Sequence, residues 1–294
     1  MSSRSMAAPS ATGGFDPSRY KQTTEQQWQT AAKAWNDWGG LLREWLGPAT
    51  ETMIEMCGIG LGARVLDVAA GAGDQTLQVA QRVGSTGYVL ATDISSNILE
   101  YADRNARAEG YTNVATRVMD GENLDVPPAS FDAVVSRVGL IYFPDQVRAL
   151  RGMHQALRPG GRVGAIVYSS PDANPFFSIP VSIIRARARL PPPVPGQPGP
   201  FSLGTPAAIE ERFRSAGFRD VQVRRVPAPL RLGSAADCVR FEQESFGALH
   251  AMMSTVSPEE RTAIWEEIHA RLAAFENGGG FVGPCELLVA SALK

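Results

Sequence analysis

Two glycines between carboxylates carry the clearest chemical signal in the sequence. Residues 65–76 read VLDVAAGAGDQT, so an apolar run that contains Asp67 leads into Gly71 and Gly73 and then into a helical pattern. Glycine allows positive φ and lets a ligand approach the backbone where a Cβ atom would block it. Such a loop after a strand is typical of sites for nucleoside cofactors, although a simple tight turn can have the same glycines.

Two more aspartates follow the next two strand-like segments. Asp93 comes twenty residues after Gly73, where a carboxylate can accept hydrogen bonds from both hydroxyls of a ribose. Asp120 follows the third segment and could accept a hydrogen bond from an exocyclic amine. Each aspartate could instead cap the helix that follows it. Because three acidic strand ends would meet at one edge of a sheet, a nucleoside site is the better interpretation.

The charges near the loop distinguish two nucleoside cofactors. The dinucleotide fingerprint GxGxxG requires a third glycine, but this sequence has Thr76 there. Asp67 and Asp74 would repel a pyrophosphate, whereas they would attract an ammonium or sulfonium group. The pattern therefore favours S-adenosylmethionine over a nicotinamide dinucleotide.

The surrounding segments alternate between strand and helix, which predicts a doubly wound α/β sheet. Short β-branched runs predict buried parallel strands, namely Arg64–Val68, Tyr88–Thr92, Val114–Met119, Ala133–Ser136 and Arg162–Val167. Amphipathic segments predict the crossover helices Asp74–Val83, Ser96–Glu109 and Asp145–Leu157, the last ended by Pro159-Gly160-Gly161. Further along, the patterns predict a helix from Thr205-Pro206 to Ser215 and strands at Val221–Val226 and Glu286–Ala290.

Helical and proline-rich segments flank this core. Apolar residues at helical spacing predict one aromatic helix over Trp28–Trp45, ended by Gly47-Pro48. Six prolines in residues 191–200 predict a stiff surface segment, and Ser234–Glu276 is a predicted helical insertion. The expected division is a disordered tail (1–14), an N-terminal helical lid (15–62), a cofactor-binding core (63–170), a proline-rich lid segment (171–204), a core helix and strand (205–233), a helical cap (234–280) and the last core strand (281–294).

Composition excludes several other classes of protein. The 294 residues are 44% hydrophobic and 20% charged, as in an ordinary soluble globule, and the net charge of −2 disfavours nucleic acid as a partner. The three cysteines form no CxxC pair and no His/Asp/Glu cluster has metal-ligand spacing, so we expect neither disulfides nor a metal site. No apolar run reaches the length of a membrane span. We expect a cytoplasmic monomer or homodimer with a small-molecule substrate.

At this point the sequence resembles the class I S-adenosylmethionine-dependent methyltransferases, most closely the ubiquinone/menaquinone-biosynthesis group. The resemblance spans Ala63–Ser170 and includes the glycine loop, ATDIS at 91–95, DGENL at 120–124, FDAVVS at 131–136 and LRPGGR at 157–162. It implies a seven-stranded, mostly parallel Rossmann-like sheet whose last strand inserts antiparallel beside Val221–Val226.

The resemblance also implies roles for individual residues. Asp67, Ala69 and Gly71 would lie near the methionine part of the cofactor, with Gly73 in the same loop. Asp93 and Ile94 would hold ribose and adenine, and Asp120 with Gly121 would contact the adenine edge. Ser136 and Arg137 would face the sulfonium.

The acceptor pocket is predicted from the aromatic residues and from Arg137, a cation among apolar neighbours. Its candidates are Trp35, Trp38, Arg137, Tyr142 and Phe143, although the tryptophans could simply pack a core. If the acceptor must lose a proton, His250 in the cap and Tyr20 before the aromatic helix are the candidate bases. His154 and His269 are expected on solvated helix faces.

These features predict an enzyme that transfers a methyl group to carbon or oxygen of a small hydrophobic or aromatic acceptor, either quinone-like or a secondary metabolite, with S-adenosylhomocysteine as product. Two alternatives remain at this stage: a small-amine N-methyltransferase, and a catalytically silent module with the methyltransferase fold.

Overall fold

The centre of the protein is a seven-stranded sheet. The computed structural model describes residues 15–192 and 197–294, so the expected disordered tail (1–14) and residues 193–196 of the proline-rich segment lie outside them. The strand order is β3-β2-β1-β4-β5-β10-β6, and β10 is antiparallel to both of its neighbours. These strands are β1 (Arg64–Val68), β2 (Tyr88–Asp93), β3 (Val114–Val118), β4 (Phe131–Arg137), β5 (Leu157–Tyr168), β6 (Arg219–Pro227) and β10 (Glu286–Leu293). The predicted doubly wound sheet with an antiparallel last strand is confirmed.

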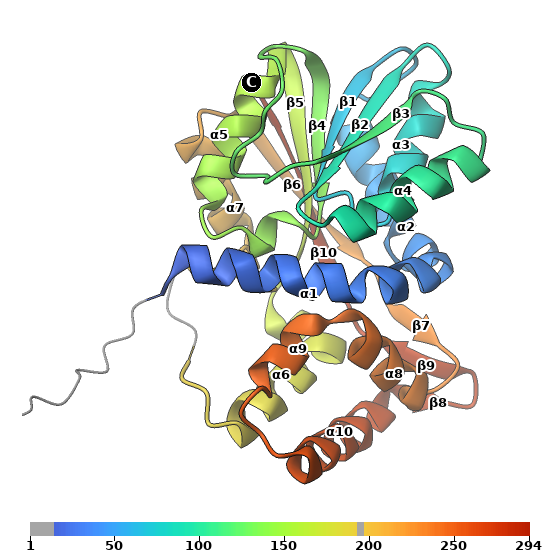
Figure 1. Cartoon of the computed structure of the whole chain (residues 1–294), viewed down its shortest axis with the longest axis vertical. Helices are drawn as coiled ribbons and strands as arrows, with labels where there is room; N and C mark the ends of the chain where they lie inside the picture. The colour runs from blue at the N-terminus through green and yellow to red at the C-terminus, as the bar shows by residue number, and fades with distance from the viewer. Residues whose placement is uncertain (1–14, 193–196) are drawn as a thin grey trace, which may run out of the picture.

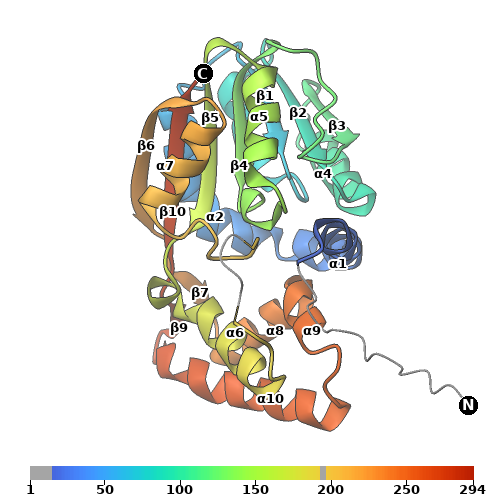
Figure 2. The same ribbon diagram turned by 90° about the vertical axis from the view of Figure 1, so that its left-hand side faces the viewer.

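Helices cover both faces of the sheet (Figures 1 and 2). On one face α2 (Gly39–Met56) packs against α3 (Asp74–Val83), which contacts α4 (Ser96–Ala108); on the other, α5 (Gln146–Ala156) packs against α7 (Pro206–Ser215). Side-chain caps begin several of these helices, since Ser95 accepts from the Ile98 N–H and Thr205 from the Ala208 N–H. The ends of α5 differ from the prediction: β5 begins at Leu157, directly after the helix, so Pro159-Gly160-Gly161 lie within the strand.

The predicted aromatic helix is wrong in its bounds. The structure has two helices, α1 (Pro17–Asp37) and α2, which meet at Trp38, and α2 continues through Pro48. Gly39-Gly40 follow Trp38 and have low helix propensity, which explains the break. Pro48 removes a helical hydrogen bond, but Leu46, Ala49 and Met53 beside it are completely buried against the sheet. Tertiary packing of that face outweighs the local cost of the proline.

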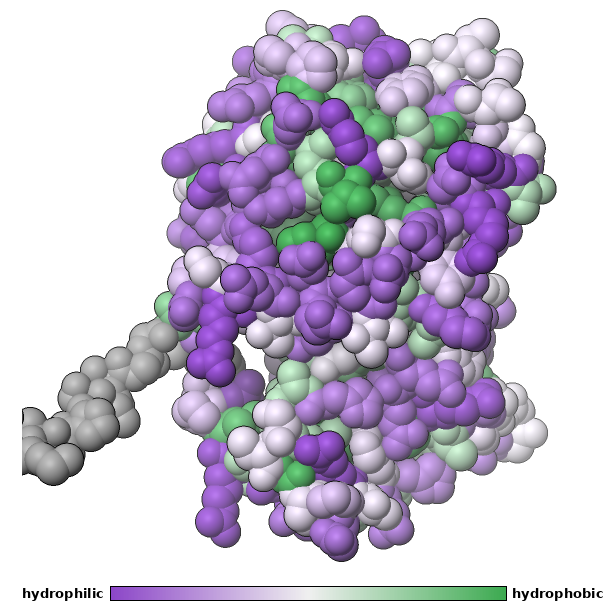
Figure 3. Space-filling view, viewed as in Figure 1, coloured by the Kyte–Doolittle hydropathy of each residue, from purple (hydrophilic) through white to green (hydrophobic). Residues whose placement is uncertain are grey.

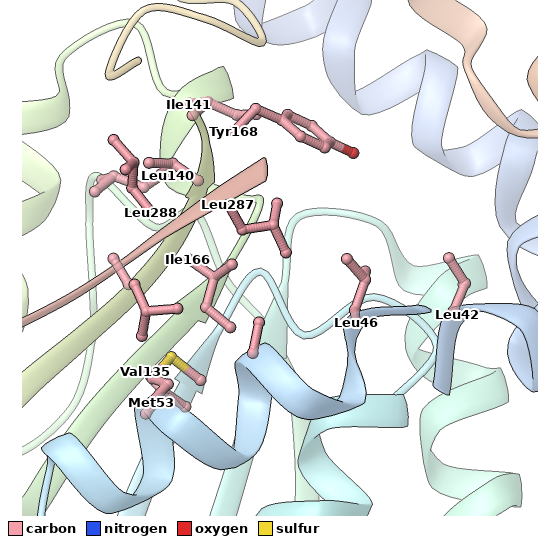
Figure 4. Packing of buried hydrophobic residues seen from close by; sticks show 14 of the residues in the cluster. Leu42, Leu46, Met53, Val135, Leu140, Ile141, Ile166, Tyr168, Leu287 and Leu288 are labelled. Carbon is pink, nitrogen blue, oxygen red and sulfur yellow. The ribbon is translucent and has the colours of Figure 1, made fainter. Parts of the chain in front are cut away.

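The apolar face of α2 contributes much of the core. Figure 4 shows Leu42, Leu46 and Met53 of this helix facing side chains of the sheet, among them Val135 and Ile166. Complete burial of a side chain of this size contributes about 1.5–3 kcal/mol. This packing holds α2 against β5 and β10.

A second layer of elements lies beyond the carboxyl ends of the strands (Figures 1 and 2). We call it the cap; it comprises α6 (Pro175–Arg187), α8 (Ala235–Ser245), α9 (Gly247–Met252), α10 (Pro258–Leu272) and a small sheet of β7 (Leu230–Leu232), β9 (Gly280–Gly283) and β8 (Glu276–Asn277). Three 3₁₀ turns complete the described chain: η1 (Leu140–Tyr142), η2 (Pro171–Ala173) and η3 (Ala273–Phe275). The sequence predicted the helical character of 234–276 but neither α6 nor the small sheet.

Helix α1 lies between the sheet and the cap in both views (Figures 1 and 2). None of the helices in residues 15–192 and 197–294 combines the length and the hydrophobicity that a membrane span needs.

Candidate active site

A cleft opens where α1 crosses the carboxyl ends of the parallel strands. It encloses about 810 Å³, part of which is open to solvent. Ten of the residues singled out in the sequence line it together: Trp35, Ala69, Gly71, Asp93, Ile94, Asp120, Gly121, Arg137, Tyr142 and Phe143. Figure 3 shows hydrophobic atoms in a hollow of the surface immediately above α1, bordered by hydrophilic atoms. The cleft therefore combines an apolar surface with carboxylates at its edge.

The two glycines of the loop serve different purposes. Gly71 has φ +59° and lines the cleft, and a Cβ atom there would approach the Trp35 ring nitrogen to 3.1 Å. Gly73 has φ +90°, and its Cβ would lie 3.0 Å from the backbone of Ala102 in α4. Gly73 thus permits close packing of α3 and α4 rather than lining the cleft, whereas Gly71 keeps the backbone open to a ligand.

Asp93 is the carboxylate best placed for a ribose. Its Oδ2 accepts from the Gly71 N–H and its Oδ1 from the Ser95 N–H, both at 3.0 Å. Burial raises the pKa of Asp93, and the backbone N–H donors oppose that effect. Since each carboxylate oxygen can accept more than one hydrogen bond, Asp93 can hold the loop and still bind ligand hydroxyls. Ile94 lies beside it in the cleft wall.

Asp67 lies beneath the cleft rather than in its wall. It is fully buried and accepts hydrogen bonds from the Thr76 hydroxyl at 2.6 Å and from the Gln75 side chain. Burial raises the pKa of Asp67 to about 6, against these hydrogen bonds. Gln75 does line the cleft, so Asp67 can influence a ligand through the side chain that it orients. The sequence did not single out Gln75.

Ser136 also lies behind the cleft wall. Its hydroxyl is buried and has no hydrogen-bond partner, and it faces the backbone of Gly139, a cleft residue.

Asp120 is already paired with a residue of α1. The Lys21 ammonium lies 2.7 Å from its Oδ2 and also contacts the Glu122 carboxylate. The Glu122 N–H donates to the other Asp120 oxygen at 2.9 Å. Lys21 lines the cleft, and the sequence did not predict it because nothing in the local sequence shows that residue 21 meets residue 120. The exocyclic amine of a nucleoside, which the sequence analysis expects Asp120 to bind, would share this carboxylate with Lys21.

Arg137 is held by a buried ion pair. Its Nη1 lies 2.8 Å from Asp74 Oδ2 and 3.1 Å from the Thr50 hydroxyl, so α2 and the start of α3 position it. The guanidinium has five N–H donors, and this residue lines the cleft. It can therefore bind a carboxylate while remaining paired with Asp74.

Aromatic rings form the wall opposite the strands. Trp28 packs edge-on against Trp35 at 5.3 Å and against Tyr142 at 6.0 Å between ring centroids. Burial raises the pKa of Tyr142 above its usual value, so its hydroxyl is neutral. Phe143 lies over Gly121, where a Cβ atom would clash with the ring. Trp28, on the predicted aromatic helix, is a lining residue that the sequence did not assign to the pocket.

Besides Asp67, Gly73 and Ser136, three more predicted site residues do not line the cleft. Trp38 donates to Glu244 at 2.8 Å and packs against Phe241, so it joins α1 to the cap. His250 is exposed and its Nε2 contacts the Gln243 carbonyl oxygen at 2.6 Å. Tyr20 lies on α1, where burial raises its pKa to about 12. His250 is therefore not placed to remove a proton from a ligand in the cleft, and the raised pKa of Tyr20 makes that side chain a poor base.

Two further observations concern side chains outside the cleft. His154 is half-buried rather than on a solvated face, because its ring packs against Phe218 at 5.0 Å. Among the described residues, no group of three or more His, Cys, Asp and Glu side chains could hold a metal ion.

Comparison with known proteins agrees with this geometry. The model of the ubiE/COQ5 methyltransferase family matches residues 44–183. The ubiquinone/menaquinone biosynthesis C-methyltransferase UbiE of Pseudomonas aeruginosa is 36% identical over 137 residues, which cover 46% of this chain and 52% of that protein. The nocamycin O-methyltransferase of Saccharothrix syringae is 26% identical over 245 residues, 80% of this chain and 87% of that protein. The chain thus spans about half the length of the UbiE relatives.

Solved structures share the fold. The YcgJ protein of Bacillus subtilis superposes with a TM-score of 0.57 at 20% identity, covering 84% of this chain and 98% of that one. A phosphoethanolamine N-methyltransferase 2 of Haemonchus contortus, solved with S-adenosylhomocysteine, gives 0.59 at 17% identity and covers 94% of this chain and 60% of that one.

The sheet topology, the glycine loop and these similarities together define a class I S-adenosylmethionine-dependent methyltransferase. Within that class the chain lies close to the ubiquinone/menaquinone-biosynthesis group, to which its core is similar in sequence. Its cofactor is S-adenosylmethionine.

Proposed function

We propose that the protein transfers the methyl group of S-adenosylmethionine to an oxygen or carbon atom of a small, planar, hydrophobic acceptor. The observation that carries this proposal is the division of the cleft, with Asp93 and Asp120 at the strand ends and Trp28, Trp35 and Tyr142 on the opposite wall. Carboxylates suit the hydroxyls and amine of a nucleoside, whereas aromatic rings suit a flat apolar molecule. The named O- and C-methyltransferase relatives agree with both acceptor atoms.

The cofactor fits the described side chains. Asp93 would accept from the ribose hydroxyls while it keeps the Gly71 and Ser95 N–H groups. Ile94 would lie against the adenine, and Asp120 with Gly121 at its edge. Arg137 would bind the carboxylate of the methionine part, and Gln75, held by Asp67, would be its neighbour. We assign Asp67, Gly73 and Ser136 supporting positions behind these residues.

The bound cofactor supplies a methyl group on a positively charged sulfur, which makes that carbon open to in-line displacement. Displacement by the acceptor oxygen or carbon would leave neutral S-adenosylhomocysteine as the second product. The protein's task is to align the two molecules and exclude water, and orientation of this kind can supply ~7–11 kcal/mol. Tyr142 and Trp28 stand where they could orient a planar acceptor.

Proton removal would depend on the acceptor. Neither His250 nor Tyr20 lines the cleft, and Tyr20 keeps its proton up to pH about 12. An acidic hydroxyl or an activated carbon can lose its proton to solvent, so such an acceptor fits best. In this proposal α1 and the cap are the lid over the reaction.

Titration with S-adenosylhomocysteine tests the cofactor assignment. Asp93→Ala should weaken binding about 5- to 30-fold, since it removes charge-assisted hydrogen bonds worth ~1–2 kcal/mol. The matched control is Asp172→Ala, because Asp172 is an exposed aspartate of η2. Calorimetry of both variants and the wild type measures the difference. Equal affinity in the two variants would contradict the role of Asp93.

Transfer of a labelled methyl group to a panel of phenols, quinols and amines then tests the acceptor class. We expect turnover with phenols or quinols. Turnover confined to amines would replace this proposal with N-methylation, and wild-type protein that binds the cofactor product but methylates none of them would contradict it.

A further inference from the structure

The cleft has a cation at its edge, between α1 and the end of β3, that the proposed function does not use. Lys21 of α1 lines the cleft, and its ammonium lies 2.7 Å from Asp120 Oδ2 and contacts the Glu122 carboxylate. An ammonium group has three N–H donors. Within residues 15–192 and 197–294 these two carboxylates are its partners, so the third donor is available to a ligand in the cleft.

Asp120 can accept a ligand amine without releasing Lys21. Its Oδ2 accepts from Lys21 and from the Asn123 side-chain amide. Its Oδ1 accepts from the Glu122 N–H at 2.9 Å, which is the one hydrogen bond to this oxygen in the described part of the chain. Since a carboxylate oxygen can accept two hydrogen bonds, Oδ1 keeps a position for an amine. An amine bound there would have the Lys21 ammonium beside it, on the other oxygen of the same carboxyl group.

The backbone N–H of Gly121 is a second donor at this edge. Gly121 is buried and lines the cleft, and its N–H has no hydrogen-bond partner among the described residues. Buried backbone N–H groups are nearly always paired, so an exception in a cleft wall points to an acceptor on a ligand. This edge therefore presents two donors, from Lys21 and Gly121, together with one acceptor, from Asp120.

An adenine base carries the complementary set of groups, because its 6-amino donor is flanked by the ring acceptors N1 and N7. Resting on the cofactor placement proposed above, we propose that Lys21 is a specificity residue for the base: its ammonium donates to N7, while Asp120 accepts from the 6-amino group and the Gly121 N–H donates to N1. Asp120 and Gly121 are neighbours in one loop and take neighbouring atoms of the six-membered ring, which leaves N7 for Lys21. Helix α1 is then part of the cofactor site, and Lys21 takes no part in the methyl transfer itself.

Analogues of S-adenosylhomocysteine that lack one ring nitrogen test this assignment. The 7-deaza analogue has C–H in place of N7 and keeps the 6-amino group. The 3-deaza analogue has C–H in place of N3, on the other side of the base, and is the control ligand. Calorimetry on the wild-type protein should show the 7-deaza analogue binding about tenfold more weakly than S-adenosylhomocysteine, the effect of one lost hydrogen bond to a charged donor.

Lys21→Met locates the effect, because it keeps the apolar stem and removes the donors. It should bring the affinity of the 7-deaza analogue to within about twofold of that of S-adenosylhomocysteine, with no change in the ratio for the 3-deaza analogue. Lys33→Met should keep the wild-type preference, since Lys33 lies on the same helix and pairs with the exposed Asp37. A tenfold preference that survives Lys21→Met would show that Lys21 only anchors α1, and would overturn the proposal.

The wild-type titrations alone separate this inference from the function on which it rests. If S-adenosylhomocysteine and its 7-deaza analogue bind equally well, the role of Lys21 is wrong and the cofactor site stands. If S-adenosylhomocysteine itself does not bind, the proposed function fails.

Discussion

Asp67 shows how a buried carboxyl can shape the site without touching the ligand. It is the one strand aspartate that lies fully beneath the cleft, and its two oxygens hold Gln75 and Thr76 at the start of α3. Because Gln75 lines the cleft, the ionisation state of Asp67 affects both the position of this side chain and the stability of the folded protein. The direction of the effect on stability can be measured.

Stability should fall as pH rises through the range in which Asp67 ionises. Its pKa is about 6 in the folded protein and ordinarily 3.8, so between these values the folded state binds more protons than the unfolded state. Asp67 should therefore reduce the free energy of unfolding by on the order of 3 kcal/mol between pH 4 and pH 7. Asp67→Asn lacks this effect, so its stability relative to the wild type should rise over the same range.

Urea unfolding of both proteins at a series of pH values measures this difference. Asp172→Asn, at an exposed aspartate, should follow the wild type throughout. A constant difference between Asp67→Asn and the wild type would mean that Asp67 does not carry the shift.

At the scale of single residues, the sequence predicted the site residues at strand ends. It missed those that segments distant in the sequence contribute. Asp93, Ile94, Asp120 and Arg137 were found because parallel strands bring their carboxyl ends to one edge. Lys21 is separated from Asp120 by 99 residues, and only the folded chain shows that contact. The spacing of residues along the sequence gives no means of pairing Lys21 with Asp120.

Among the elements, α1 depends most on a few polar contacts. Lys21 joins it to Asp120 and Glu122, and both partners of the Lys21–Asp120 pair are about a quarter exposed. Partial burial lowers the pKa of Lys21, but hydrogen bonds to the two carboxylates raise it overall. Burial likewise raises the pKa of Asp120 while the Lys21 hydrogen bond lowers it overall. Both side chains of the Lys21–Asp120 pair are therefore charged from about pH 5 to pH 9.

Removing the Lys21 charge should loosen the start of α1. Lys21→Met keeps the apolar stem and should speed amide hydrogen exchange in the first half of α1 about fivefold, corresponding to ~1 kcal/mol. Lys33→Met is the matched control, because Lys33 lies on the same helix and pairs with the exposed Asp37. Hydrogen exchange with mass spectrometry measures both. Equal acceleration in the two variants would show that the pair with Asp120 has no special part in holding α1.

The accuracy of the element prediction follows from what each element packs against. The strands β1, β2, β3 and β10 were located within a few residues because each is a short apolar or β-branched run of strand length. The passage of α2 through Pro48 depends on the sheet against which this helix packs, whereas the break at Trp38 follows from Gly39-Gly40. The strands of the small sheet have two to four residues, too few for a pattern of alternation.

For the whole molecule, the sequence indicated that a cap exists but not that α1 would join it to the sheet. Gln29 of α1 accepts from the Ser95 hydroxyl at 2.9 Å and from the Asn97 N–H at 3.0 Å. Both donors follow directly after β2, so this contact joins α1 to the sheet. Trp38, at the other end of the helix, donates to Glu244 of the cap. These contacts join segments far apart in the chain, and each uses a residue type that is common on solvated helix faces.

This arrangement predicts that a ligand in the cleft is sensed by the cap. S-adenosylhomocysteine would contact Asp93 and Ile94, which lie beside the Ser95 and Asn97 groups that bind Gln29, so it should slow hydrogen exchange in α1 and, through Trp38, at the end of α8. Gln29→Ala should leave protection at the strand ends but reduce it in α8, since the path from sheet to helix is cut. Helix α7, on the opposite face of the sheet, is the internal reference (Figure 2). Protection of α7 equal to that of α8, in either protein, would mean that the ligand stabilises the molecule uniformly and that α1 transmits nothing in particular.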